Sequence, residues 1–308
     1  MSNTKLRLTT RKPAWFWPFG ASKPTVVTRY WPRNDRQEAS DHDAAVEMLI
    51  GHVRGLARYL AANGHKAAMG LTAGKDSRLL FAALHDADPY LFTFVRSRSG
   101  LKTSDEETRA ARLVAERYGA TREVYAIRTQ TTEEDVSDPF AYAYRRSSSY
   151  LRGRTAIWQK RLAEKGFDYA STRFIRGSGG EVLRGFYQKT RRSIRYVNAL
   201  NRARAYSINV TSPTTLKQFC RFMRVADFST RGLRGWDAND TFYWEHRMGL
   251  WGSASLSEAD LALPALAGYN SRNLFVRFMR LPWPERKDGR SFQKATMPLA
   301  PKLADLPD

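Results

Sequence analysis

The stretch AAMGLTAGKDSRLLFAAL, Ala67 to Leu84, constrains the fold of this chain more than any other feature. A short apolar run ends in a turn of small residues, and leucines and alanines at helical spacing follow the turn. This order predicts a buried strand over Lys66–Thr72 that leads directly into a helix. Such turns often hold a phosphate at the N-terminus of the helix, but a tight turn capped by Asp76 is the alternative.

The same alternation continues through the first half of the chain. We expect a helix that begins with Ser40 as its N-cap and stops at Asn63–Gly64. The other expected elements are strands at Tyr90–Val95, Arg122–Ile127 and within Phe167–Ile175, a helix after the capping box Ser104–Glu107, and a helix near Ala156–Lys165. Strands that alternate with helices predict an α/β fold, a parallel sheet with helices on both faces.

Beyond Gly185 the pattern changes, and four segments have helical character. They are Thr214–Val225, Asp240–Trp251, Ser271–Leu281 and Ser291–Ala300. No strand is expected there. We therefore predict a basic and aromatic N-terminal arm over 1–24 and one domain over 25–308, with an α/β core at about 40–187 and a mainly helical part at about 188–308.

Composition limits the chemistry that this chain of 308 residues can use. Its single cysteine, Cys220, excludes a disulfide framework and any cysteine-based metal site. The five histidines have no paired spacing of metal ligands. No apolar run is long enough to cross a bilayer, and the N-terminus lacks a signal-peptide pattern, so we expect a cytoplasmic protein without a membrane span.

The net charge of +21 attracts polyanions such as nucleic acids, nucleotides and anionic membranes. The positive residues are spread along the whole chain with only short clusters, and an arginine excess can also reflect genome composition. The charge therefore allows a nucleic-acid partner without requiring one.

The turn itself suits phosphate binding. The small residues Ala73 and Gly74 let backbone N–H groups approach an anion, and Lys75 can add positive charge. Asp76 would repel a bare phosphate, but an acid here is useful if it holds Mg²⁺ that bridges phosphate oxygens.

Two stretches resemble a known family. LTAGKDSRLL resembles the SGGxDS pyrophosphate loop of the PP-loop ATP pyrophosphatases, and RGSGGEVLRGFY (Arg176–Tyr187) resembles the SGEGxDExxGGY segment of the asparagine synthetase synthetase domain. Three more pieces agree in order: VVTRYWP, SDEETRAARLVAERYGA and GYNSRNLFVRFMRLPWPERKDGRSFQKATM. The resemblance covers about Thr25 to Leu306.

The resemblance implies roles for matching residues. Asp76 and Glu181 would hold Mg²⁺, and Lys294 would steady the phosphates during adenylation, which makes these three the expected catalytic residues. The residues expected to bind ATP are Gly70, Leu71, Thr72, Ala73, Gly74, Lys75, Asp76, Ser77, Val95, Gly177, Ser178, Gly179 and Gly180.

The chain also departs from the family's pattern. Thr72 and Ala73 replace a serine and a glycine, and Ser178 stands where the family has a glutamate. Arg176 and Arg184 replace small or apolar residues, so we expect these arginines and Ser178 to contact the substrate. The family's glutaminase domain is not expected, and a separate amidotransferase could supply ammonia.

We therefore expect an ATP-dependent, Mg²⁺-dependent ligase that forms AMP and pyrophosphate. It would adenylate a small-molecule or peptide carboxylate and transfer it to an amine or ammonia. Two alternatives remain open at this point, a tRNA-modifying PP-loop enzyme and a catalytically degenerate nucleotide-binding domain.

Overall fold

The computed structural model describes residues 5–7, 26–28, 31–39, 41–97, 105–128, 139–147, 156–189, 196–206 and 212–303. The chain forms two compact units. The helical unit consists of residues 1–38 and 185–245, and the sheet unit of residues 39–184 and 246–308. The last sixty or so residues, helical by sequence, thus belong to the same unit as the sheet.

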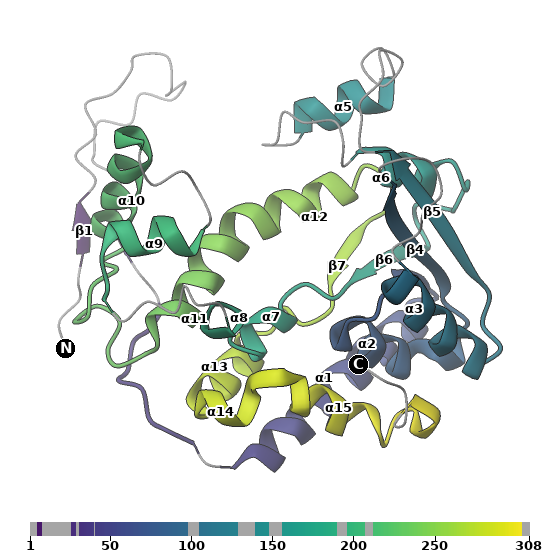
Figure 1. Cartoon of the computed structure of the whole chain (residues 1–308), viewed down its shortest axis with the longest axis horizontal. Coiled ribbons are helices and arrows are strands. Elements are labelled where there is room, and N and C mark those ends of the chain that lie inside the picture. Colours follow the sequence, from purple (N-terminus) through teal and green to yellow (C-terminus); the bar gives the residue numbers. More distant parts are fainter. Residues whose placement is uncertain are drawn as a thin grey trace. The chain divides into compact units, whose positions relative to one another are not determined.

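The sheet unit contains a five-stranded parallel sheet (Figure 1). Its strands are β3 (Lys66–Gly70), β4 (Tyr90–Ser97), β5 (Arg122–Arg128), β6 (Thr172–Arg176) and β7 (Ala265–Ala267). Their order across the sheet is β5-β4-β3-β6-β7. The chain moves outward from β3 through β4 to β5 and then returns to place β6 on the other side of β3. The order therefore reverses between β3 and β6, and ligands of open α/β sheets bind at such a reversal.

Helices cover both faces of the sheet. The helices of this unit are α1 (His42–Ala62), α2 (Lys75–Leu84), α3 (Asp105–Arg117), α5 (Pro139–Ser147), α6 (Ala156–Ala163), α7 (Gly180–Leu183), α12 (Ser253–Ala259), α13 (Arg272–Arg280), α14 (Trp283–Arg286) and α15 (Arg290–Thr296). On one face Ala68, Phe92 and Phe174 pack with Leu162 of α6 and Ala259 of α12. Met69 is fully buried and alternates with Ala68, so it points to the opposite face, where α1 and α2 contact β3.

The α/β fold expected from the sequence is confirmed, with differences at element ends. The N-cap of α1 is Asp41, whose Oδ1 accepts a hydrogen bond from the Ala44 N–H at 2.8 Å, whereas Ser40 lies outside the described residues. Ser104 and all of the arm predicted over 1–24 except residues 5–7 also lie outside them. The expectation of no strand after Gly185 is wrong, because β7 pairs with β6 over three residues.

In the helical unit, short helices surround an aromatic core. They are α8 (Phe186–Lys189), α9 (Ala199–Ala205), α10 (Pro213–Val225) and α11 (Ala238–Phe242), and α11 continues into a π-helical segment at Tyr243–Gly252. Strands β1 (Lys5–Arg7) and β2 (Val26–Thr28) pair antiparallel. Arg202 is fully buried, with its guanidinium 5.3 Å from the Phe242 ring centroid, and burial lowers its pKa to about 10.

Within the described residues, no helix combines the length and the apolar character that crossing a membrane requires.

Candidate functional site

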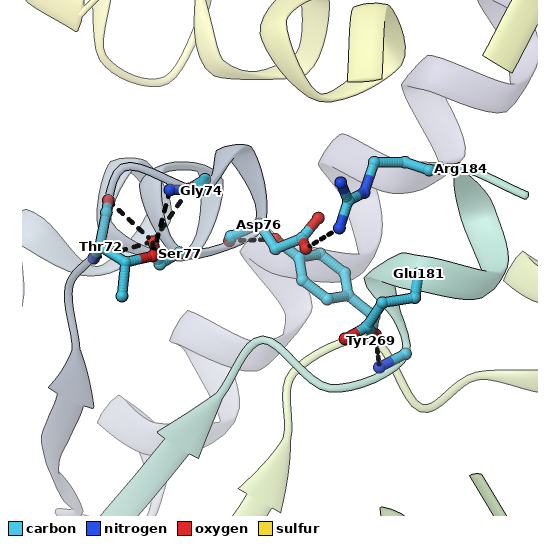
Figure 2. Close-up of polar contacts among 8 residues, drawn as sticks. Thr72, Gly74, Asp76, Ser77, Glu181, Arg184 and Tyr269 are labelled. Carbon is cyan, nitrogen blue, oxygen red and sulfur yellow. Dashed lines mark hydrogen bonds and ion pairs between the residues drawn. The ribbon is translucent and has the colours of Figure 1, made fainter. Parts of the chain in front are cut away.

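Two loops meet at the carboxyl ends of β3 and β6, where the strand order reverses. The first, Leu71–Gly74, follows β3 and leads into α2, and the second, Gly177–Gly179, follows β6 and leads into α7. Most of the residues that the sequence singled out lie on these loops or in the first turns of their helices. Figure 2 shows them facing one another.

The first loop is held by its own hydroxyl groups. Thr72 Oγ1 accepts a hydrogen bond from the Gly74 N–H at 3.1 Å and lies 3.0 Å from Ser77 Oγ. The Ser77 hydroxyl is buried and donates to the Gly74 carbonyl at 2.9 Å. Helix α2 begins after Gly74 without a side-chain cap, so its N-terminal dipole faces the loop. The alternative prediction of a turn capped by Asp76 is wrong.

Asp76 instead forms an ion pair across the two loops. Its Oδ2 lies 2.5 Å from Nη2 of Arg184, which follows α7. Both side chains are largely buried, with 15% and 21% of their surface exposed. The Arg184 guanidinium also lies 5.8 Å from the Phe292 ring centroid. A charge-assisted bond of this kind, partly shielded from water, is stronger than a surface ion pair.

Gly177 of the second loop and Gly180 at the start of α7 leave the space that Asp76 occupies. A Cβ atom at Gly180 would lie 2.6 Å from Asp76 Oδ1, and one at Gly177 would lie 3.2 Å from Asp76 Cβ. Tyr269 supports the same turn from the other side, because its hydroxyl donates to the Asp76 carbonyl oxygen at 2.6 Å. Burial, followed by the charge of Asp76, raises the pKa of Tyr269 well above its usual value. Tyr269 therefore holds a neutral hydroxyl against the backbone of α2.

Glu181 closes its own loop. Its Oε2 accepts a hydrogen bond from the Gly179 N–H at 3.1 Å, and the Tyr269 N–H donates to the Ser178 carbonyl at 3.3 Å. Gly179 has φ of 99°, a conformation that favours glycine, and a Cβ there would lie 3.1 Å from the Phe275 ring.

Lys75 is tied to the C-terminal part of the sheet unit. Its Nζ donates to the Asp288 carbonyl at 2.7 Å. A Cβ at Gly289 would lie 2.6 Å from Lys75 Cδ, so the close approach depends on that glycine. The segment around Asp288 thus reaches the first loop through Lys75.

The structure does not bring every expected residue to the loops. Lys294 lies on α15 and its Nζ pairs with Asp43 Oδ1 of α1 at 2.5 Å, with about half of its side chain exposed. The Arg176 guanidinium donates to the carbonyl and the hydroxyl of Ser255 on α12, at 2.7 Å each. Burial lowers the pKa of Arg176, and the charge of Glu258 opposes this. Both side chains therefore bind neighbouring helices.

Of the remaining residues that were expected to bind ATP, some lie in the strands of the sheet and others in the two loops. Gly70 ends β3 opposite Phe92, while Val95 lies within β4, paired with Ala126. Leu71 is fully buried and donates its N–H to the Phe92 carbonyl at 2.8 Å, so its backbone contributes to the sheet. Ala73 and Ser178 are partly buried within their loops.

Sequence reasoning missed Tyr269, although it lies in the stretch GYNSRNLF that carried part of the resemblance. Tyr269 lies two residues beyond β7, and residues that follow parallel strands gather at one edge of the sheet. Without β7 in the predicted fold, Tyr269 had no reason to be placed there.

Comparison with protein-family models and with curated protein sequences finds no significant match for this chain.

Mg²⁺ takes one or two carboxylates together with substrate phosphates. Asp76 and Glu181 supply two carboxylates, from the first turns of α2 and α7. Among the residues that the structure describes, no three His, Cys, Asp or Glu side chains gather to hold a metal ion. Asp76 and Glu181 could hold Mg²⁺ together with nucleotide phosphates only if Asp76 gave up its contact with Arg184.

Proposed function

We propose that this chain is an ATP-dependent, AMP-forming ligase of the asparagine synthetase type. One observation carries the proposal: a helix N-terminus after β3 and an acid-bearing glycine loop after β6 meet where the strand order reverses. The sequence resemblance of LTAGKDSRLL and RGSGGEVLRGFY points to the same chemistry. A cytoplasmic location belongs to the proposal, since ATP is the cosubstrate.

In this proposal the first loop binds the phosphates of ATP. The dipole of α2 and the charge of Lys75 attract the anion, and Arg184 can move from Asp76 Oδ2 to a phosphate oxygen. Asp76 and Glu181 would hold Mg²⁺, which would screen the phosphate charge. Tyr269 acts as a positioning residue, because it fixes the backbone of Asp76.

The proposed reaction has two displacement steps. A carboxylate oxygen of the substrate attacks the α-phosphorus, the bond to the bridging oxygen breaks, and pyrophosphate leaves with the electron pair. An amine or ammonia nitrogen then attacks the acyl carbon, AMP leaves, and a proton passes to solvent. A guanidinium beside the phosphates stabilises the charge that develops on the leaving group.

Pyrophosphate release tests this function. The chain is incubated with ATP, Mg²⁺, ammonium and a panel of carboxylic acids, and Asp76→Asn and Glu181→Gln are compared with the wild type. Glu47→Gln, an exposed acid on α1, is the matched control. We expect at least one acid to support release, both site variants to lose it, and the control to keep it.

A second candidate function is nucleotide binding without catalysis. Two ion pairs favour this function. Lys294 and Asp76, both expected to be catalytic, are paired with Asp43 and Arg184 in the structure. ATP binding by calorimetry without pyrophosphate release from any acid would support this second function. Absence of both ATP binding and release would overturn both candidates.

A further inference from the structure

The net positive charge is concentrated in the helical unit, because acidic residues are few there. This unit holds about a third of the residues but more than half of the net charge of +21, and its Lys and Arg outnumber its Asp and Glu about three to one. Surface charge of one sign over a small region attracts polyanions at long range.

Segment 185–245 contains four acidic residues, Asp227, Asp237, Asp240 and Glu245. Asp237 caps α11 by accepting from the N–H groups of Asn239 and Asp240, at 2.8 and 2.9 Å. Asp240 itself is buried, and Asp227 accepts from the Ser229 hydroxyl at 3.2 Å. Neither α9 nor α10 contains an acidic residue. The exposed residues Arg204, Lys217, Arg221 and Arg224 therefore have no acidic residue on their own helix.

Three of those side chains form a stripe on α10. Lys217, Arg221 and Arg224 are exposed and stand at positions i, i+4 and i+7, which places them on one side of the helix. The stripe is about 10 Å long at the helical rise. Arg204 of the adjacent α9 and Arg231 beyond α10 are also exposed. Within the described part of the chain, none of the five forms an ion pair.

The opposite face of α10 packs into the core of its own unit. Phe219 is buried, and the Phe222 ring lies 5.4 Å from Phe228 and 5.8 Å from Phe242 between centroids. A helix that binds a membrane surface inserts its apolar face into the lipid, and this face is already occupied. The exposed side offers arginines and a lysine instead, which suit phosphate groups in a backbone. Figure 1 shows α9 beside α10 in this unit.

We propose that Lys217, Arg221 and Arg224 of α10 form a binding surface for the phosphate backbone of a nucleic acid. The surface lies in the helical unit and does not depend on the proposed ligase activity. Arg204 and Arg231 extend it. Contacts of this kind set affinity and salt dependence rather than sequence preference.

Fluorescence anisotropy of the full chain with a labelled mixed-sequence DNA duplex and with an RNA hairpin tests the surface. The triple variant Lys217→Ala, Arg221→Ala, Arg224→Ala is compared with Arg54→Ala, Arg58→Ala, Lys66→Ala, which removes three exposed charges from the sheet unit. Each variant loses three positive charges. If binding depended only on the overall net charge, the two variants would therefore lose affinity for nucleic acid equally.

We expect the α10 variant to bind at least about tenfold more weakly, with a salt slope reduced by about one per lost contact. The control variant should bind within about twofold of the wild type. Arg221→Lys with Arg224→Lys keeps the charges and the helix, and should retain most of the binding. Comparing the two probes shows whether RNA or DNA is preferred.

Cys220 gives an independent readout, because it is the only cysteine, is exposed and lies beside Arg221. An environment-sensitive fluorophore on Cys220 should change its emission when nucleic acid is added. Equal losses in both triple variants, no binding of either probe, or a silent label during binding would each overturn the proposal. So would α10-dependent binding to phosphatidylserine vesicles without nucleic-acid binding.

Discussion

Asp76 and Arg184 stand 108 positions apart in the sequence, and their side chains meet at 2.5 Å between Oδ2 and Nη2. The pair joins the first turn of α2 to the C-terminal end of α7. It places a positive charge beside the Asp76 carboxylate and fixes the position of the Arg184 guanidinium. The contact therefore holds the start of α2 against the end of α7.

The ion pair should couple the two loops energetically. In a double-mutant cycle with Asp76→Ala and Arg184→Ala, we expect a coupling of roughly 1–3 kcal/mol, because the pair is partly shielded from water. The pair Lys165–Glu123 has a similar separation of 2.5 Å but more exposed side chains. Its cycle should give a clearly smaller coupling energy, because solvent screens this exposed pair. Urea denaturation measures both, and equal coupling energies would contradict the prediction.

Arg184 should also contribute to nucleotide affinity. If its guanidinium moves to a phosphate oxygen, Arg184→Ala should weaken ATP binding by roughly ten- to a hundredfold, and Arg184→Lys by less. Calorimetric titration with and without Mg²⁺ measures the ATP affinity. Arg58→Ala, which changes an exposed arginine of α1, is the control. Tighter ATP binding by Arg184→Ala would instead mean that the ion pair obstructs the site.

The space beside Asp76 should tolerate no side chain at Gly180. A Cβ there would lie 2.6 Å from Asp76 Oδ1, so Gly180→Ala should lower the free energy of unfolding by roughly 1–3 kcal/mol. Gly51→Ala is the matched control, since nothing lies within 4 Å of its Cβ position inside α1. That change should stabilise the chain by roughly 0.5–1 kcal/mol. Similar effects of the two substitutions would refute the packing argument.

The Tyr269 hydroxyl should stabilise the turn at the start of α2. Tyr269→Phe removes the donor to the Asp76 carbonyl and should cost roughly 0.5–1.5 kcal/mol of unfolding free energy. Tyr59→Phe, at a tyrosine that is 47% exposed, should change stability little. Thermal and urea denaturation of both variants measure the difference. If Tyr269→Phe left the free energy of unfolding unchanged, water would be replacing the hydroxyl as the donor.

Acid should destabilise the fold through His246. Burial, with a smaller effect of Arg247, lowers the pKa of His246 to about 4, so the folded chain holds a neutral imidazole. The unfolded chain, with a pKa near 6.5, binds a proton first as the pH falls. Stability should therefore decrease from about pH 6.5 to about pH 4, by at most roughly 3 kcal/mol, and level off below that range for this group.

The pH dependence of urea denaturation tests the His246 prediction. His246→Gln removes the titrating group, so its unfolding free energy should fall less between pH 7 and pH 4 than that of the wild type. Because the comparison concerns the pH slope, a constant loss of stability in the variant does not affect it. Parallel slopes would exclude His246 as the source.

The sequence by itself determined the elements whose signals are local. The apolar run over Ala67–Met69, the small residues of the turn and the leucines of α2 specify a strand, a turn and a helix within one short stretch. The same holds for β4 and β5, where consecutive apolar and aromatic residues suit a buried parallel strand. Alternation of such elements was enough to predict an α/β fold.

Only the tertiary structure decided β7 and the partners of the charged side chains. Ala265–Ala267 is too short for any periodicity, and it is a strand because β6 supplies its hydrogen bonds. Lys294 was expected beside the phosphates but pairs with Asp43, since packing of α15 on α1 brings them together. Asp76 likewise meets Arg184 because β3 and β6 are neighbours. A sequence lists charges in order, whereas their pairing depends on which distant segments the fold places in contact.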